Sequence, residues 1–388
     1  MHILLVLTNE FQTKASPIGG VFQLDQAKVL RSAGYKVGVI SPALLSPRRF
    51  LLNYKYKKKE IIQKIPVLRE YKKNLLPAKI KFFNNFFINY YETKGLSLFD
   101  EYKKKFGTPD ILHVFDIRFG LFVGNIIKEK RNVPFILTEY CAEVASNTLP
   151  LTQNFIKNKV KNKIINAHKI TTCSKKFSSI FKKKLDIKKN VGVHYPVMPP
   201  SSSKASIKII KKKKFTFISV NRLDPNKNVE LIVNAFSNNF KGKEAVLELV
   251  GKGPNLKIIK KLIKKKKIKD QVFIYENLSR NEMLSKLSRA NCCLVASKVE
   301  TFGVILIEAA ARGLSLISTK AEGPLEIVNK INGFLVEQGS VKKYGQAMIK
   351  TIDLNLSIKK RKLIRNDIIN RFGNKIYLKR IRNILNKI

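Results

Sequence analysis

The sequence has few cysteines and no long apolar run, and each scarcity argues against a class of protein. The four cysteines include no Cys-x-x-Cys pair, which argues against a disulfide scaffold and favours a reducing compartment. No apolar stretch approaches the ~18–20 residues that a membrane-spanning helix needs, so we expect no transmembrane segment. Residues 1–7 lack the basic region and cleavage site of a secretory signal and are expected to form a buried strand.

The patterns that usually bind metals or dinucleotides are also missing. None of the nine aspartates lies two positions from another, and the four histidines have no His-Glu-x-x-His or similar spacing. Neither half of the chain has Gly-x-Gly-x-x-Gly after its first expected strand, which weakens the case for a dehydrogenase. We therefore expect no metal and no cofactor.

Acidic residues are scarce relative to basic ones. The 388 residues include 76 Lys+Arg and 27 Asp+Glu, a formal net charge of +49. With 44% hydrophobic residues, the chain is not a disordered polycation, and its length suggests two or three domains of about 150 residues. The excess is mostly lysine spread along the chain, and coding bias explains it as well as an anionic partner does. No recognisable nucleic-acid-binding module is present, so we expect no specific nucleic-acid partner.

Short apolar runs alternate with helical patterns in two stretches of the chain. Strands alternating with helices form parallel sheets covered by helices, so the expected fold class is α/β with two parallel-sheet halves. A Pro/Ser-rich segment, residues 198–206, separates the two and is expected to pack little. Strands are expected at 3–7, 36–40, 111–115, 135–138 and 169–173 before it, at 215–220, 245–250, 271–275, 291–296 and 314–318 after it, and helices at 22–33, 121–130 and 153–167.

Two cations follow the first expected strand of the second half. Arg222 and Lys227 lie in the loop after residues 215–220, at the edge of a parallel sheet where open α/β folds bind ligands. An arginine and a lysine there suit a diphosphate. The alternative is that both are ordinary surface cations. The turn at Gly251–Gly253, after the next strand, is by itself a weak motif.

The strongest pattern is a pair of glutamates separated by seven residues. Glu300 follows the strand at 291–296, and Glu308 lies in the helix that comes next. The start of that helix, at Phe302, Gly303 and Val304, offers unpaired backbone N–H groups. Carboxylates accept strong hydrogen bonds from the vicinal hydroxyls of a sugar or a ribose. The alternative is a helix-start glutamate followed by a surface glutamate.

Together these residues resemble the retaining glycosyltransferases of family 4, over nearly the full chain. Glu300 and Glu308 match the family's Glu-x7-Glu motif, Arg222 and Lys227 its basic pair, and residues 250–254 its glycine turn. Residues 321–328 resemble its late glycine-containing loop, and 371–388 its terminal helix.

The resemblance implies the GT-B fold, with two Rossmann-like domains that face each other across a cleft. The expected domains are an acceptor-binding domain at 1–197, a linker at 198–213, a donor-binding domain at 214–370, and a C-terminal helix at 371–388 that packs back on the first domain. The implied reaction moves a sugar from a UDP- or GDP-sugar, with retention and without a metal. The implied acceptor is a saccharide or lipid-linked saccharide in cell-surface polysaccharide or glycolipid assembly, such as lipopolysaccharide.

The resemblance also suggests roles for individual residues. Glu300 would orient the hydroxyls of the donor sugar as a catalytic residue, and Glu308 would hold the ribose. Gly20, in a Gly-Gly loop before a helix, would lie near the donor diphosphate. His113, in a segment similar to the family's Pro-Asp-strand-His segment, would be catalytic, although a lone histidine at a strand end is often structural. Phe115 and Tyr140 stand where many members carry histidines near the transferred sugar.

Two rival classes of function stay open. A nucleotide-sugar epimerase or a phosphorylase could share the fold, although no lysine-bound cofactor site is found. A non-catalytic, basic nucleic-acid-binding protein is the alternative from a different class.

Residues 54–105 are rich in aromatic and basic residues, and this segment is a candidate for acceptor binding or membrane contact. At helical pitch one broad face carries Phe82, Phe83, Phe86, Phe87, Tyr90 and Tyr91. Lysine runs lie at 57–59 and 103–105. This face could pack on the first domain's sheet, line an acceptor cleft, or contact an anionic membrane. The expected location is cytoplasmic, with a peripheral contact to the inner face of the cell membrane as the further hypothesis.

Overall fold

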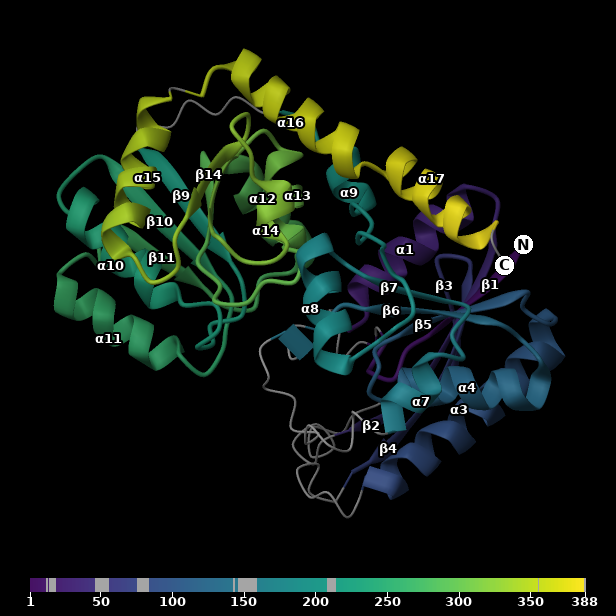
Figure 1. Cartoon of the computed structure of the whole chain (residues 1–388). Helices are drawn as coiled ribbons and strands as arrows, with labels where there is room; N and C mark the ends of the chain where they lie inside the picture. Colours follow the sequence, from purple (N-terminus) through teal and green to yellow (C-terminus); the bar gives the residue numbers. More distant parts are fainter. Residues whose placement is uncertain are drawn as a thin grey trace. The chain divides into compact units, whose positions relative to one another are not determined.

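The computed structural model describes residues 1–11, 13, 19–45, 56–74, 84–141, 144–145, 159–207, 214–354 and 356–386. These form two compact units (Figure 1). Unit 1 comprises Met1–Val197 together with Tyr377–Ile388, and unit 2 comprises Met198–Ile376.

Unit 1 is built on an eight-stranded sheet in the order β3-β4-β2-β1-β5-β6-β7-β8. The strands β1, β5 and β6 are buried along their whole length, as expected for parallel strands covered on both faces. The strands are β1 (His2–Val6), β2 (Lys36–Leu45), β3 (Lys59–Ile62), β4 (Ile65–Lys73), β5 (Ile111–Phe115), β6 (Phe135–Glu139), β7 (Lys169–Thr172) and β8 (Val191–Val193). The helices are α1 (Val21–Ser32), α3 (Asn84–Phe106), α4 (Gly120–Arg131), α7 (Lys161–Ile164) and α8 (Lys175–Leu185).

Unit 2 is built on a six-stranded sheet in the order β11-β10-β9-β12-β13-β14, with every pair parallel. The first strand of the unit thus lies beside the fourth, which makes a topological switch point between β9 and β12. The strands are β9 (Phe215–Val220), β10 (Ala245–Val250), β11 (Val272–Tyr275), β12 (Cys292–Val295), β13 (Ser315–Thr319) and β14 (Gly333–Val336). The helices are α9 (Pro200–Ser203), α10 (Val229–Phe240), α11 (Leu256–Lys266), α12 (Arg280–Arg289), α13 (Val304–Ala310), α14 (Pro324–Ile327), α15 (Val341–Asp353) and α16 (Ile358–Phe372).

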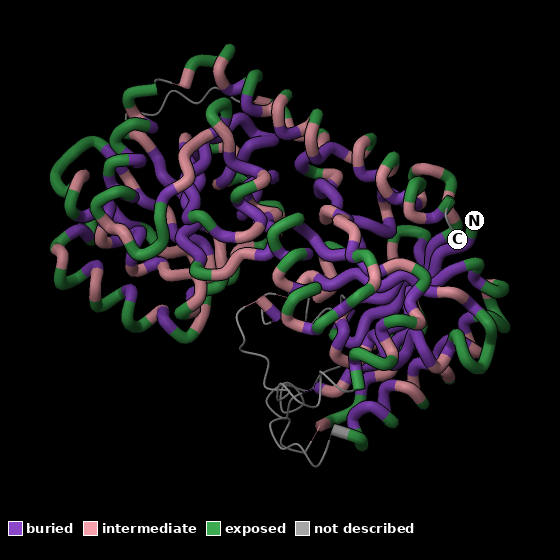
Figure 2. The backbone as a smooth tube through the Cα atoms, in the orientation of Figure 1, coloured by how far each residue is buried: buried purple, intermediate pink, exposed green. Residues whose placement is uncertain are grey.

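The predicted α/β class and all ten predicted strands are confirmed. In both units many of the buried residues lie in the strands (Figure 2). The second strand is longer than predicted, at Lys36–Leu45. Much of the helix predicted at 153–167 lies outside the described residues; within it the structure describes α7.

The hairpin of β3 and β4 has no counterpart in the prediction. The two strands pair antiparallel, and the turn between them is made by Gln63 and Lys64, which both have positive φ. Such tight turns usually carry glycine or asparagine, and neither residue stands here, so the turn could not be predicted. The hairpin extends the sheet at the edge next to β2.

The prediction that residues 198–206 pack little is wrong. The segment contains α9, and Met198 and Ser202 are fully buried. Arg312 donates to Ser202 Oγ at 2.9 Å, and Arg365 donates to the carbonyl of Ser203 at 2.9 Å. Two arginines far along the sequence therefore fix this segment to unit 2.

The last helix, α17 (Asn374–Leu385), completes the core of unit 1. Tyr377, Ile381 and Leu385 recur every four residues and are buried in one cluster with strand residues such as Leu5. The helix predicted at 371–388 starts later than expected, because Arg371 still belongs to α16, where it donates to the carbonyls of Glu326 and Ile327.

Within the described ranges, none of the helices combines the length and the apolar character that crossing a bilayer requires.

Truncating Ile381 should destabilise unit 1 because its side chain fills that core. We expect Ile381→Ala to lower the free energy of unfolding by about 2–4 kcal/mol, measured by urea denaturation. The matched control is Lys379→Ala, at an exposed position of the same helix, which should change it by less than about 0.5 kcal/mol. Equal effects of the two substitutions would contradict this packing.

Candidate functional site

Two of the predicted site residues of unit 2, Lys227 and Glu300, meet at the switch point of its sheet. Lys227 lies in the loop after β9, and Glu300 in the loop after the neighbouring strand β12. The Lys227 ammonium donates to Glu300 Oε2 at 2.6 Å, and the Ser297 hydroxyl donates to the same oxygen at 3.1 Å. Both members of the ion pair are largely buried. The structure therefore brings Lys227 and Glu300 into one site.

The backbones of these two loops are also joined. The side chain of Asn226 donates to the carbonyl of Val299 at 2.9 Å and accepts from its N–H at 3.0 Å, and Lys298 N donates to the carbonyl of Asn226 at 2.8 Å. The position of Lys227 relative to Glu300 is thus fixed by the backbone as well as by charge.

Arg222 has a different environment from Lys227. Its side chain is 73% exposed, and its Nε lies 3.7 Å from Asp224 Oδ2. The same aspartate caps the loop, because its Oδ1 accepts from the N–H groups of Asn226 and Lys227. Arg222 thus extends from a rigid loop into solvent and does not contact Glu300.

The glycine turn after β10 is explained by close backbone approach. A Cβ at Gly251 would lie 1.9 Å from the carbonyl oxygen of Asn221, and one at Gly253 would lie 2.2 Å from that of Leu223. Any side chain at either position would therefore push apart the loops after β9 and β10.

The start of α13 holds the three predicted helix-start residues. Gly303 has φ of 98° and precedes the first helical residue, Val304. Phe302 is buried and meets the ring of Phe372 edge-on at 5.8 Å. The positive φ explains why glycine stands at position 303.

Glu308 lies in the middle of α13 and is held by two arginines. Its side chain is 3% exposed and forms an ion pair with Arg280, the first residue of α12. Arg312 donates to the backbone carbonyl of Glu308 at 2.9 Å. Burial lowers the pKa of Arg312, and the negative charge of Glu308 opposes that shift. Arg280 was not predicted, because nothing in its sequence context separates it from the many other cations.

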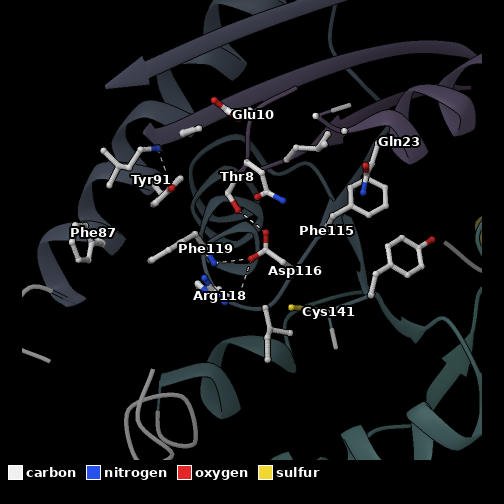
Figure 3. Close-up of a pocket in the computed structure, with 18 of the residues that line it drawn as sticks. Thr8, Glu10, Gln23, Phe87, Tyr91, Phe115, Asp116, Arg118, Phe119 and Cys141 are labelled. Carbon is white, nitrogen blue, oxygen red and sulfur yellow. Dashed lines mark hydrogen bonds between the residues drawn. The ribbon is translucent and has the colours of Figure 1, made fainter. Parts of the chain in front are cut away.

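Unit 1 contains a pocket of about 830 Å³ at the carboxyl edge of its sheet (Figure 3). The pocket is lined by the ends of β1, β2, β5 and β6 and by the starts of α1, α3 and α4. Gly20 lines it and has φ of 60°, and a Cβ there would lie 2.6 Å from the ring of Phe11. Gly20, the glycine predicted in this loop, therefore lies directly before helix α1 and forms part of the pocket wall.

None of the three carboxylates that line the pocket, Glu10, Asp116 and Glu139, was predicted from the sequence. Asp116 accepts from the N–H groups of Arg118, Phe119 and Gly120 through Oδ1, and from the Thr8 hydroxyl through Oδ2 at 2.5 Å. It therefore caps helix α4 and ties it to the end of β1. Figure 3 shows Thr8 and Asp116 pointing toward one another.

Glu139, at the end of β6, accepts from the backbone N–H groups of Ile117 at 2.9 Å and Cys141 at 2.6 Å. Burial, with the nearby charge of Asp116, raises the pKa of Glu139 to about 7, although its two hydrogen bonds oppose the shift. The only sequence signal for this residue is its place just before Tyr140 at a strand end.

His113 lies inside the sheet and is not among the residues that line the pocket. Its Nδ1 is 2.8 Å from Gln26 Nε2, and its Nε2 is 2.7 Å from Thr138 Oγ1. Burial lowers the pKa of His113 well below its ordinary value. The amide of Gln26 donates to Nδ1, so Nε2–H donates to Thr138. These contacts give His113 a structural role, and its catalytic role stays a prediction without a contact in its favour.

The aromatic face of α3 is used largely inside unit 1. Phe87 and Tyr91 line the pocket, and Tyr91 stacks on Phe119 with ring centroids 4.3 Å apart. Tyr90 is buried, whereas Phe86 is 51% exposed. Two members of the predicted face, Phe82 and Phe83, lie outside the described residues. Of the open alternatives, core packing and pocket lining hold for Phe87, Tyr90 and Tyr91.

Among the described residues, no group of three or more histidines, cysteines or acidic residues is arranged to hold a metal ion.

The raised pKa of Glu139 predicts a pH dependence of stability. Between the ordinary pKa of 4.5 and about 7, the folded protein binds more protons than the unfolded chain, so its stability falls as pH rises through this window. Glu139→Gln removes that titration. Relative to the wild type, we expect it to gain about 1–3 kcal/mol between pH 5 and pH 8, measured by urea unfolding.

The control for this prediction is Glu129→Gln, at an exposed position of α4. Its stability difference from the wild type should stay constant over the same pH range. If Glu139→Gln shows the same constant difference, Glu139 does not titrate as the structure indicates.

Comparison with known proteins bears on both units. Residues 202–369 match the family model described as Glycosyl transferases group 1. The curated relatives include an N-acetyl-alpha-D-glucosaminyl L-malate synthase from Bacillus anthracis, 32% identical over 29% of this chain and 29% of the relative. They also include the GPI3 subunit of a phosphatidylinositol N-acetylglucosaminyltransferase from Saccharomyces cerevisiae, 27% identical over 37% of this chain and 32% of the relative. The match thus spans less than a third of the length of either protein.

Solved structures match the chain along its whole length. A lipopolysaccharide outer core galactosyltransferase has a TM-score of 0.70 at 17% identity, with all of both chains covered. Sucrose-phosphate synthase from Thermosynechococcus elongatus has a TM-score of 0.76 at 16% identity, covering 100% of this chain and 99% of that one. The Anabaena protein HepE, in complex with UDP, has a TM-score of 0.71 at 17% identity, with both chains fully covered. These likenesses show the fold.

The family match, the relatives' names and the fold together support a transferase enzyme. Residues 202–369 match the glycosyl transferases group 1 model, and the solved structures show that the chain as a whole has the GT-B fold.

Proposed function

We propose that this protein transfers a sugar from a nucleoside-diphosphate sugar to an acceptor hydroxyl, with retention at the anomeric carbon. The observation that carries the proposal is the pairing of Lys227 with Glu300 at the switch point of unit 2. Those are the residue types that a diphosphate and a sugar require side by side, and they lie in the segment that matches a glycosyltransferase family.

In the proposed donor complex, Lys227 and Arg222 bind the diphosphate. Lys227 turns from Glu300 toward the phosphate oxygens, and the exposed Arg222 closes on them from solvent. Both stabilise the negative charge that develops on the departing diphosphate. Glu300, released from Lys227, accepts hydrogen bonds from the hydroxyls of the transferred sugar, and Glu308 accepts from the ribose.

The proposed chemical step is a displacement on one face of the sugar. The bond between the anomeric carbon and the phosphate oxygen breaks, and a bond to the acceptor oxygen forms on the same face. The acceptor hydroxyl gives its proton to an oxygen of the departing diphosphate. Atoms and charge balance without a separate base, which agrees with a site whose carboxylates serve to orient hydroxyls.

The pocket of unit 1 is the proposed acceptor site. Its rings, which include Phe87, Tyr91 and Phe119, can cover the apolar face of a sugar ring, and Asp116 and Glu139 can accept from its hydroxyls. The relatives differ in acceptor, since one name contains L-malate and another phosphatidylinositol. We propose a saccharide or lipid-linked saccharide of cell-surface polysaccharide or glycolipid assembly.

Donor binding tests the proposal first. A panel of UDP- and GDP-sugars should raise the melting temperature of the full chain, because a ligand that binds only the folded state stabilises it. A nucleotide-sugar epimerase would also be stabilised but would convert the donor without an acceptor. A phosphorylase would need inorganic phosphate to turn over, and a nucleic-acid-binding protein would bind DNA and no donor.

Substitutions then test the roles of the donor residues. Glu300→Gln and Arg222→Ala should each lower turnover at saturating donor by about 10²-fold, the loss typical of removing one group that stabilises the transition state. Lys243→Ala, at an exposed position before β10 and so at the opposite edge of the sheet, should leave turnover unchanged. Near-normal turnover of the Glu300 and Arg222 variants would refute these assignments.

A peripheral contact with an anionic membrane is a separate proposal about location. It is supported by the exposed ring of Phe86 at the start of α3 and by Lys103, Lys104 and Lys105 in the last turn of that helix. Each lysine near an anionic surface contributes about 1 kcal/mol.

We expect the protein to sediment with phosphatidylglycerol vesicles and to bind them less as salt is raised. Changing Lys103–Lys105 to glutamine should lower the affinity for the vesicles about 10–100-fold. The matched control changes Lys264–Lys266, in the last turn of α11, which removes the same charge from unit 2. No binding at low salt, or an equal loss in both variants, would count against this contact.

A further inference from the structure

We propose that Arg280 is a donor-site residue that positions the carboxylate of Glu308 for the ribose hydroxyls of the nucleotide. This inference rests on the proposed function, because it takes Glu308 as the ribose ligand. It adds a residue from the start of α12 to those in the loops that follow β9 and β12.

The contact itself is direct. An Nη2–H of Arg280 donates to Glu308 Oε1. Glu308 is 3% exposed and Arg280 is 33% exposed, so the arginine is the more accessible member of the pair. A ligand that contacts the Glu308 carboxylate therefore has the Arg280 guanidinium within reach.

The backbone of Arg280 is held firmly enough to aim its side chain. It is the first residue of α12, directly after a capping box in which the Ser279 hydroxyl accepts from the N–H of Glu282 and the Glu282 carboxylate accepts from the N–H of Ser279. Both groups are bonded locally, so the start of the helix is fixed without Arg280. The guanidinium is not needed to build the helix on which it stands.

The two arginines near Glu308 have different tasks. Arg312 is buried and contacts the Glu308 backbone carbonyl together with the hydroxyls of Ser202 and Ser288. It fixes the backbone of α13 and the segment at α9. Arg280 contacts the carboxylate. Of the two arginines, Arg280 is the one that holds the Glu308 carboxylate, which would accept hydrogen bonds from the ribose hydroxyls.

The chemical consequence concerns the strength of the ribose contact. A carboxylate buried to this degree is costly to ionise without a cation beside it. Arg280 supplies that cation, and hydrogen bonds to a charged acceptor are stronger than neutral ones. A guanidinium also has five N–H groups, so Arg280 can hold Glu308 with one and meet a ribose oxygen with another.

The experiment measures whether Arg280 acts through the ribose hydroxyls. Dissociation constants of UDP, 2′-deoxy-UDP and 3′-deoxy-UDP are determined calorimetrically for the full-length wild type and for Arg280→Met. In the wild type, removing the hydroxyl that Glu308 binds should weaken binding about ten-fold. Arg280→Met should bind UDP about ten-fold more weakly than the wild type does. Its hydroxyl penalty, which is the ratio of the dissociation constants of the deoxy analogue and UDP, should fall to about two-fold.

Two further variants separate positioning from general charge or folding. Arg280→Lys keeps a cation and should restore part of the hydroxyl penalty. Lys286→Met is the matched control, because Lys286 lies on the same helix and its Nζ is 3.5 Å from Glu248 Oε1; it should leave both the affinity and the penalty unchanged. Arg280→Met and Glu308→Gln should be non-additive, because they remove parts of one contact.

The outcomes are distinguishable. An unchanged hydroxyl penalty in Arg280→Met overturns the inference, even if UDP binds more weakly, because that loss would then be one of charge alone. The same holds if Arg280→Lys restores nothing while its melting temperature matches the wild type. A wild type that binds neither UDP nor GDP overturns the proposed function, and this inference with it.

Discussion

The parallel pairing of strands that are buried on both faces is the constraint on which this molecule depends. A strand buried on both faces cannot carry exposed polar side chains, and a parallel neighbour requires the chain to cross back before it re-enters the sheet. Every strand except the antiparallel β3 therefore ends at the same edge of its sheet. The polar groups gather at the strand ends and in the loops there: Lys227 and Glu300 in unit 2, and Asp116 and Glu139 in unit 1.

Near that edge, the candidate site of unit 2 contains two ion pairs. Glu300 is paired with Lys227 and Glu308 with Arg280, and each pair joins two different loops or helices. Each carboxylate thus has a cation beside it, and the paired side chains join neighbouring elements without a ligand. A nucleotide sugar would then replace partners of similar strength rather than order a disordered site, which keeps the cost of binding low.

How much the sequence could predict depends on how local the determining contacts are. Ten strands and the positions of Lys227 and Glu300 after two of them could be predicted, because each lies in a clear local pattern. The roles of these residues toward a donor stay predictions. The packing of α9 did not, because Ser202 is held by Arg312, more than a hundred residues away. The turn at Gln63 and Lys64 has no glycine. Asp116 and Glu139 were missed because an isolated acid near a strand end is also a common capping residue.

The place of α17 has a consequence for how the chain matures during synthesis. Tyr377, Ile381 and Leu385 fill the core of the unit that contains the first strand, yet they leave the ribosome after all of unit 2. Domains generally fold as units in the order in which they emerge, so unit 2 can close its core while unit 1 still exposes the apolar groove that α17 will cover. Unit 1 is synthesised first, but its core stays incomplete until α17 has packed against it.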